Sequence, residues 1–246
     1  MSAKRTIGIV AGGLALLGGI GALGVVGVTA LINSMSGPSF ELDDLLPTPE
    51  PIETVATPAS APANDSAWLD QTAEATGIPR RALSAYVAAS VRAENDGCTV
   101  GWNTLAGIGW VESHHGALQG GSIEADGVAR PGIIGIPLDG TNKTMEIRDT
   151  DGGAFDGDAE YDRAVGPLQF IPETWRIWGV DVSGDGVADP HNIDDAAATT
   201  ARYLCRLDGT LETDETWIRA VRSYNDTLDY QTRVATAAAR YADAVG

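Results

Sequence analysis

One carboxylic acid interrupts an otherwise apolar helical face. In WNTLAGIGWVESHHG, residues 102–116, a turn of about 100° per residue places Trp102, Leu105 and Ile108 on the same face as Glu112. A Glu at that position is expected to face the protein interior. A desolvated carboxyl has a raised pKa and can stay protonated near neutral pH, so Glu112 is a candidate general acid. A structural acid that forms hydrogen bonds in the core is the alternative.

Two adjacent histidines follow this acid. Neighbouring residues on a helix point about 100° apart, which makes His114 and His115 a poor pair of metal ligands. Together with Gly116 they fit the last turn of a helix and its left-handed cap. We therefore expect both histidines to be surface or capping residues.

A second candidate for polar recognition is Gln169. In AVGPLQFIPETWRIWG, residues 164–179, it lies among Leu168, Phe170 and Ile171. Taken alone, a Gln in this setting is expected to be buried and to satisfy backbone groups. Beside a buried acid, its amide could instead hold the amide or hydroxyl of a sugar.

An acidic segment lies between these two candidates. DTDGGAFDGDAEYD, residues 149–162, carries six acids and no base. Such a run is most often a solvated loop. Cation binding, or a role for one of these acids as a second catalytic carboxylate, is the alternative.

A second acidic stretch, DVSGDGVADPHN (residues 181–192), resembles an EF-hand calcium loop. The ligands would be the side chains of Asp181, Ser183, Asp185 and Asp189 and the carbonyl of Val187. They occupy positions 1, 3, 5, 9 and 7 of the motif, and helices are expected on both sides. Position 12 is Asn192 instead of the usual bidentate Glu, which weakens the site. Structural calcium and a metal-free Asp/Gly turn both stay open.

The elements that must position these residues are mainly helices. Caps and apolar periodicity predict seven of them, at residues 66–77, 79–95, 102–116, 172–179, 194–209, 214–226 and 230–245. Between Gly116 and Gly166 the chain is rich in Gly and Asp. There, 132–138 and 144–149 flank DGTNK and predict a small β-hairpin. The predicted fold class is mostly α (α+β).

An uncharged segment near the N-terminus predicts a membrane anchor. Residues 7–32 carry no charged side chain, and a helix needs about 20 such residues to span the bilayer core. Two basic residues precede this segment, and none follows it before Arg80. This asymmetry predicts a cytoplasmic tail at residues 1–6 and an extracytoplasmic remainder of the chain. A signal peptide cleaved near residues 28–30 is the alternative, and it too exports the domain.

The exported part divides into a linker and one domain. Residues 33–65 contain six of the twelve prolines and few large apolar residues, which predicts an extended linker. Residues 66–246 are long enough for a single domain with its own core. The net charge of −18 argues against nucleic acid as a partner of this domain.

The chain has two cysteines, Cys98 and Cys205, and both lie on the exported side. In an oxidising compartment the expected state is one disulfide between them. Two thiols and three scattered histidines do not favour a zinc site.

Four segments together carry a family resemblance. GWVESHHG, AVGPLQFIPETW, DVSGDGVADPHNIDDAAATTARYLC and YNDTLDY occur in this order. They resemble the lytic murein transglycosylases related to membrane-bound lytic transglycosylase B, and the resemblance runs from about residue 67 to the C-terminus. It implies a lysozyme-like transglycosylase domain that acts on peptidoglycan glycan strands. Some members carry an EF-hand-like calcium site, which adds support to calcium at 181–189.

The resemblance also implies roles for individual residues. Glu112 matches the family's only catalytic acid/base. The implied substrate-binding residues are Ser113, Gln169, Phe170, Tyr224, Asn225 and Tyr230. Tyr224 also lies on the apolar stripe formed by Trp217 and Val221, so a position in the core is an equally good interpretation of this residue.

The implied chemistry explains why one acid is enough. Protonated Glu112 would donate to the oxygen between N-acetylmuramic acid and N-acetylglucosamine, and the carboxylate would then deprotonate the muramic 6-hydroxyl, which closes a 1,6-anhydro ring. No cofactor is required for this reaction. A hydrolytic muramidase that uses Glu112 and an acid from 149–162 is the first alternative. A catalytically silent, calcium-stabilised wall-binding module is the second.

Overall fold

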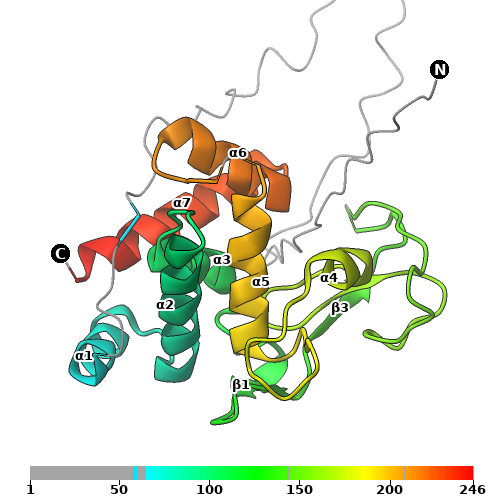
Figure 1. Ribbon diagram of the computed structural model, residues 1–246. Helices are drawn as coiled ribbons and strands as arrows, with labels where there is room; N and C mark the ends of the chain where they lie inside the picture. The colour runs from blue at the N-terminus through cyan, green and yellow to red at the C-terminus, as the bar shows by residue number, and fades with distance from the viewer. Residues whose placement is uncertain (1–57, 60–64, 143, 208, 246) are drawn as a thin grey trace, which may run out of the picture. The chain divides into compact units, whose positions relative to one another are not determined.

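The computed structural model describes residues 58–59, 65–142, 144–207 and 209–245 of the chain (Figure 1). All seven helices expected from the sequence are present there, and the fold is mostly α, as predicted. They are α1 (Ser66–Thr76), α2 (Arg80–Asn95), α3 (Trp102–Ser113), α4 (Pro172–Trp178), α5 (Ile193–Cys205), α6 (Asp214–Tyr224) and α7 (Leu228–Asp243). A 3-10 turn, η2 (Leu118–Gly120), follows α3.

The predicted N-terminal segments cannot be compared with this structure. The tail at 1–6, the membrane segment at 7–32 and nearly all of the linker at 33–65 lie outside the described residues. Of the helices in the described part, none combines the length and the apolar character needed to cross a bilayer. The anchor therefore stays a prediction.

Short polar side chains begin four of the helices. Asp65, Asn192, Thr213 and Thr227 accept hydrogen bonds from N–H groups in the first turns of α1, α5, α6 and α7. Each satisfies a donor that a helix start leaves unpaired. The cap of α1 is Asp65, one residue before the range 66–77 that the sequence predicted for this helix.

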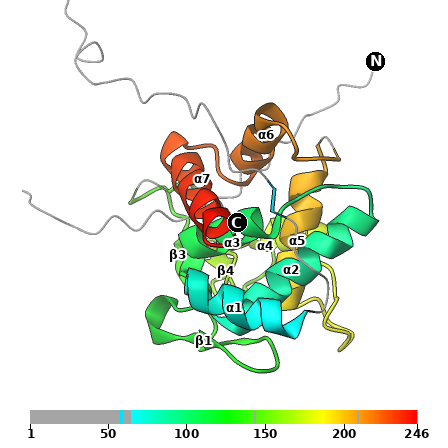
Figure 2. The same cartoon turned by 90° about the vertical axis from the view of Figure 1, so that its left-hand side faces the viewer.

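The helix that carries Glu112 lies at the centre of the packing. Eleven of the twelve residues of α3 are buried, as expected for a helix that is apolar on all sides. Helices α7 and α2 both pack against α3 (Figure 2), and α2 also packs along α5. Two glycines permit this close approach, because a Cβ atom on Gly107 would lie 2.9 Å from the Val234 carbonyl oxygen and one on Gly109 would lie 2.1 Å from the Tyr86 hydroxyl.

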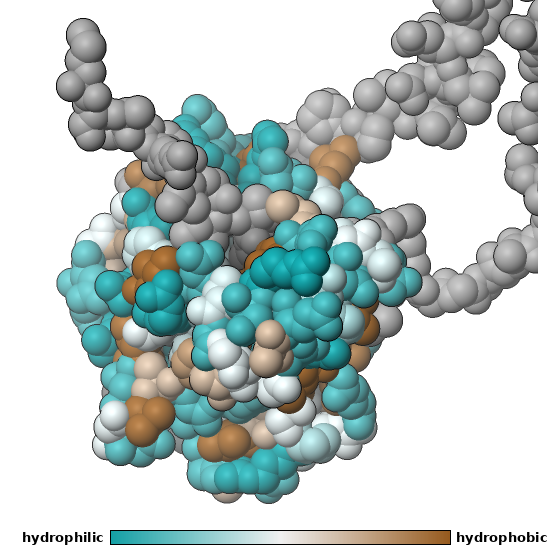
Figure 3. Space-filling model, turned by 90° about the vertical axis from the view of Figure 1, so that its right-hand side faces the viewer, coloured by the Kyte–Doolittle hydropathy of each residue, from teal (hydrophilic) through white to brown (hydrophobic). Residues whose placement is uncertain are grey.

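The excursion between α3 and α4 contains two short antiparallel strand pairs. β1 (Ser122–Ile123) pairs with β2 (Ala129–Arg130), and β3 (Ile134–Pro137) pairs with β4 (Arg163–Val165). Figure 3 views the molecule from the side on which β3 and α4 lie. Hydrophilic residues cover most of this face, and hydrophobic ones are scattered among them.

The β-hairpin predicted from 132–138 and 144–149 is only partly correct. The chain does reverse there, with a bridge between Asp139 and Glu146, but the strand partner of β3 is β4. The physical reason is burial. Ala164 and Val165 of β4 are fully buried, whereas Met145 is 55% exposed, so β4 gives β3 a partner that belongs to the core.

The predicted disulfide is present. Cys98, just after α2, is bonded to Cys205, the last residue of α5. The two residues are 107 positions apart. A parallel bridge between Thr99 and Thr210 lies next to the bond. The crosslink therefore closes a long covalent loop that contains α3 and the whole β excursion.

Replacing both cysteines should destabilise the fold strongly. In the chain-entropy model, opening a loop of this length lowers the free energy of unfolding by roughly 3–5 kcal/mol. We expect the Cys98→Ser/Cys205→Ser variant to unfold at a much lower urea concentration than the oxidised wild type. Reduced wild type should approach the variant. Equal midpoints for the variant and the oxidised protein would contradict this expectation.

Candidate active site

Glu112 lies in the last turn of α3 and is buried, with 2% of its surface exposed. The prediction that this side chain faces the interior is confirmed. The helix ends at the next residue, Ser113, and the cap residue His114 adopts the left-handed conformation with φ 50°. The carboxyl is thus held at the end of a central helix, surrounded by the helices that pack against it.

The two oxygens of the Glu112 carboxyl have different surroundings. The hydroxyl of Tyr230, on α7, donates a hydrogen bond of 2.7 Å to Oε1. The other oxygen, Oε2, is buried and has no hydrogen-bond partner among the described residues. A buried, unpartnered oxygen is costly unless a ligand completes it. One oxygen of the Glu112 carboxyl is therefore fixed by Tyr230, and the other is available to a ligand.

Burial raises the pKa of Glu112 to about 8. The hydrogen bond from Tyr230 and the positive charge of Arg233 act in the opposite direction, and they reduce the rise without cancelling it. The carboxyl is therefore protonated at neutral pH, as a general acid must be before it reacts.

A stack of aromatic residues holds Tyr230 in place. The Tyr224 ring lies parallel to the Tyr230 ring at a centroid distance of 6.4 Å. Phe170 meets Tyr224 edge-on at 5.7 Å. The Tyr224 hydroxyl donates to the Leu168 carbonyl at 2.6 Å. The tyrosine that contacts Glu112 is thereby connected to the loop before α4.

Ser113 fixes that loop to the end of α3. Its hydroxyl donates to the Pro167 carbonyl at 2.6 Å and accepts from the Gly116 N–H at 2.8 Å. Gly166 is required at the start of the turn, because a Cβ atom there would lie 1.8 Å from the Pro190 carbonyl oxygen. These short, buried contacts set the distance between Glu112 and the Gln169 loop.

The side chain of Gln169 has the structural role that the sequence suggested for it alone. It is 3% exposed, its backbone has a φ of 49°, and its amide donates to the Gly166 carbonyl at 2.9 Å. Phe170, Tyr224 and Ser113 are also buried and have partners inside the protein.

Asn225, at the C-terminal end of α6, is 7% exposed. The contacts described above connect Glu112 through Tyr230 to Tyr224 and Phe170. The hydroxyls of Ser113 and Tyr224 bond to the loop that carries Gln169. Among the predicted substrate-binding residues, Tyr230 donates a hydrogen bond to the acid itself. Direct contact of the others with a glycan stays a prediction.

His115 departs from its expected place. The prediction of a surface or capping residue holds for His114, which is exposed, and is wrong for His115. The ring of His115 is buried between the hydroxyls of Tyr86 and Tyr241, at 3.1 Å and 2.9 Å. Burial lowers its pKa to about 3, so the ring is neutral. The residue fastens the end of α3 to α2 and α7.

The six acids of residues 149–162 are engaged within their own excursion. Five of them accept hydrogen bonds from nearby backbone N–H groups, and Glu160 lies 3.6 Å from Arg148. Asp149, Asp151 and Asp162 form a cluster in which one carboxylate oxygen of each residue lies within 4.8 Å of those of the other two. Through these hydrogen bonds and this ion pair, the acids stabilise the tight turns of their own loop.

The predicted calcium loop has a well-formed turn but an incomplete ligand set. Asp181 accepts from the N–H groups of Gly184 and Gly186, as the first residue of such a loop would. Asn192 is buried and caps α5, so it does not replace the missing Glu. The fully buried Asp195 accepts from three N–H groups of the loop and already holds it closed. Calcium at this position stays a prediction.

Comparison with known proteins gave one family match and one similar structure. Residues 148–244 match the family model described as "Transglycosylase SLT domain". The matched region contains Gln169 and Tyr230 and begins after Glu112. The structure is similar to that of the Escherichia coli lytic transglycosylase Slt35 in complex with bulgecin A. The identity is 16%, the likeness covers 75% of this chain and 80% of that chain, and the TM-score is 0.43. No curated protein matches the chain.

Calcium should raise the melting temperature if the loop at 181–189 binds it, because a ligand that binds only the folded state stabilises it. Asp185→Ala should abolish this response. Asp185 suits the test because its carboxylate accepts a hydrogen bond from the Val187 N–H within the loop. The buried Asp195, which holds the loop closed, stays in place in this variant. Asp126→Ala, a change to an exposed acid of another loop, is the control. A wild-type melting curve that is indifferent to calcium and to chelator would identify a metal-free turn.

Glu112→Gln should stabilise the fold, and the gain should grow with pH. Between the usual pKa near 4.5 and the raised value of about 8, the unfolded chain releases a proton that the folded protein keeps. The wild type therefore loses up to about 1.4 kcal/mol of unfolding free energy per pH unit in this window. Gln avoids this loss because it does not titrate. Denaturation of both proteins at about pH 5 and about pH 8 tests this, and a difference independent of pH would contradict a raised pKa.

Proposed function

We propose that this protein is a peptidoglycan lytic transglycosylase with a lysozyme-like fold, and that it breaks the β-1,4 bond between N-acetylmuramic acid and N-acetylglucosamine and leaves a 1,6-anhydro ring on the muramic acid. The match of residues 148–244 to a transglycosylase domain supports the proposal. The observation that carries the proposal is the Glu112 carboxyl. It is protonated at neutral pH, fixed through one oxygen by Tyr230 and unpartnered at the other within the described residues.

In the first step Glu112 acts as the acid. Oε2 carries the proton to the glycosidic oxygen, because Oε1 is occupied by the Tyr230 hydroxyl. The bond between this oxygen and C1 of the muramic acid breaks, and the N-acetylglucosamine leaves as an alcohol. Positive charge develops at C1, beside the carboxylate that has just formed.

In the second step the same residue acts as the base. The Glu112 carboxylate takes the proton of the muramic 6-hydroxyl, and O6 attacks C1 to close the anhydro ring. Glu112 ends the cycle protonated, so no net proton is consumed. Tyr230 donates to the carboxylate between the two steps and stabilises it. Because the nucleophile belongs to the substrate, the enzyme does not need a second acid to activate water.

The two alternatives fit these contacts less well. A hydrolytic muramidase needs a second carboxylate to activate water or attack the sugar. The acids of 149–162 accept hydrogen bonds or pair with Arg within their own excursion. A wall-binding module without activity would gain nothing from Glu112, since its burial destabilises the fold as the pH rises towards 8.

We further propose that the enzyme works in cell-wall turnover from the outer face of the cell membrane. The support comes from the sequence, where residues 7–32 are uncharged and residues 33–65 are rich in proline. An extended linker of this length reaches on the order of 100 Å at about 3 Å per residue. The domain could therefore reach glycan strands well away from the membrane.

Glu112→Gln should remove activity and spare the fold. Gln keeps the size of the side chain and can still accept from Tyr230, but it carries no transferable proton. We expect kcat on purified peptidoglycan to fall by about a thousandfold or more. Glu94→Gln, a change to an exposed Glu on α2, should match the wild type. Melting curves of both variants show whether the fold is intact.

Mass spectrometry of the wild-type digest tests the reaction itself. The expected products end in 1,6-anhydromuramic acid and add no new reducing ends. Reducing sugars in the digest, together with an acid of 149–162 that proves as essential as Glu112, would show a two-carboxylate hydrolase instead.

A further inference from the structure

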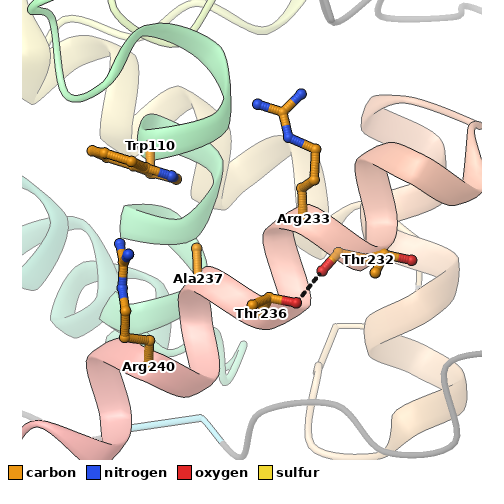
Figure 4. Close-up of a pocket in the computed structure, with 6 residues that line it drawn as sticks. All are labelled: Trp110, Thr232, Arg233, Thr236, Ala237 and Arg240. Atoms are coloured by element: carbon orange, nitrogen blue, oxygen red, sulfur yellow. Dashed lines mark hydrogen bonds between the residues drawn. The ribbon is translucent and has the colours of Figure 1, made fainter. Parts of the chain in front are cut away.

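A groove of about 210 Å³ lies between α3 and α7. Its walls are formed by Trp110, Thr232, Arg233, Thr236, Ala237 and Arg240 (Figure 4). The two guanidinium groups rise from α7 on the side of Trp110, and the small Ala237 lies between them. Two arginines in one groove are notable in a protein with a net charge of −18.

The guanidinium of Arg240 is positioned by aromatic rings. It lies 5.1 Å from the centroid of the Trp110 ring and 4.8 Å from that of Tyr241, and it donates to the Tyr241 hydroxyl at 3.0 Å. Within the described residues no carboxylate lies within 4.0 Å of Arg240. Arg233 has Asp229 at 3.9 Å, at the limit of an ion pair. Among the described residues, therefore, little negative charge lies close enough to compensate the positive charge of the groove.

The groove begins next to the catalytic acid. Arg233 follows Tyr230 by about one turn of α7, and its charge lowers the pKa of Glu112 from the value that burial alone would give. Arg240 lies seven residues further, which is about 10 Å along the helix axis. The groove thus leads away from the bond that Glu112 would break.

We propose that this groove binds the peptide stem of the muramic acid at the cleaved bond, through the carboxylates of the stem. The inference rests on the proposed function and adds a determinant of substrate choice to it. The stem is attached to the same sugar whose C1–O bond reacts, so it must leave the site close to Glu112. A guanidinium binds a carboxylate through two parallel hydrogen bonds, and the indole of Trp110 offers an apolar surface to the alanine methyl groups of a stem.

An acidic peptide fits this groove better than the sugar chain does. The hydroxyl and acetamido groups of a glycan are neutral, and they give no reason to place two poorly compensated arginines in one groove. Carboxylates do give such a reason, since a guanidinium forms its strongest hydrogen bonds with an ionised acceptor.

Two matched substrates separate the stem from the glycan. One is uncross-linked peptidoglycan strands with their stems, and the other is the same strands after an amidase has removed the stems. The quantity measured is the ratio of kcat/KM on the two substrates. Arg240→Gln should lower this ratio about fivefold, the effect of about 1 kcal/mol, mainly through KM on the stem-bearing strands. Arg240→Lys should keep part of the preference, because it keeps the charge and loses the two-pronged geometry.

The control is Arg92→Gln, which removes a positive charge from an exposed position on α2 and should leave the ratio and the activity at wild-type values. Melting temperatures equal to that of the wild type show that the variants are folded. An Arg240→Gln variant that loses activity equally on both substrates, or on neither, would overturn the stem proposal. Failure of the wild type to form anhydro products from either substrate would overturn the proposed function itself.

Discussion

Removing the Glu112 carboxyl from water disfavours its charged form more than the Tyr230 hydroxyl and the Arg233 guanidinium favour it. This imbalance is what keeps a proton on the acid at neutral pH. It depends on α3 being covered on every side, and therefore on the close approach of α7 and α2 that glycines in α3 allow. A helix packed less closely would admit water and return the carboxyl toward its ordinary pKa.

Much of the surrounding polar structure serves to hold this burial in a fixed geometry. Ser113 bonds the end of α3 to Pro167, and Tyr224 bonds α6 to Leu168 in the same loop. His115, held between two tyrosine hydroxyls, fastens the next turn of the chain. Ser113 and Tyr224, which the sequence suggested as substrate contacts, therefore also help to set the position of Glu112. The carboxylates of the β excursion and of the loop before α5 also have a structural role, because they stabilise tight turns.

The sequence was a good guide wherever local patterns decide structure. Apolar periodicity and caps located all seven helices, and the helical stripe placed Glu112 inside the protein. The failures have a common cause, which is that the deciding contact lies far away in the chain. His115 is buried because of Tyr86 and Tyr241, 29 and 126 positions away. Likewise, β3 pairs with β4 rather than with the nearer segment, because β4 belongs to the core. No spacing rule reveals such partners from one sequence.

The disulfide divides the residues of the candidate active site into a covalently closed part and an open part. Glu112 and Ser113 lie between Cys98 and Cys205, whereas Tyr230 and Arg233 lie beyond the bond, on the last helix. If the two C-terminal helices opened, the crosslinked part would keep its covalent connections. The Glu112 carboxyl would then lose its phenol donor and become hydrated, and its pKa would return towards the ordinary value. Proteolytic trimming at the C-terminal end would inactivate the enzyme by the same route and leave a crosslinked remnant behind.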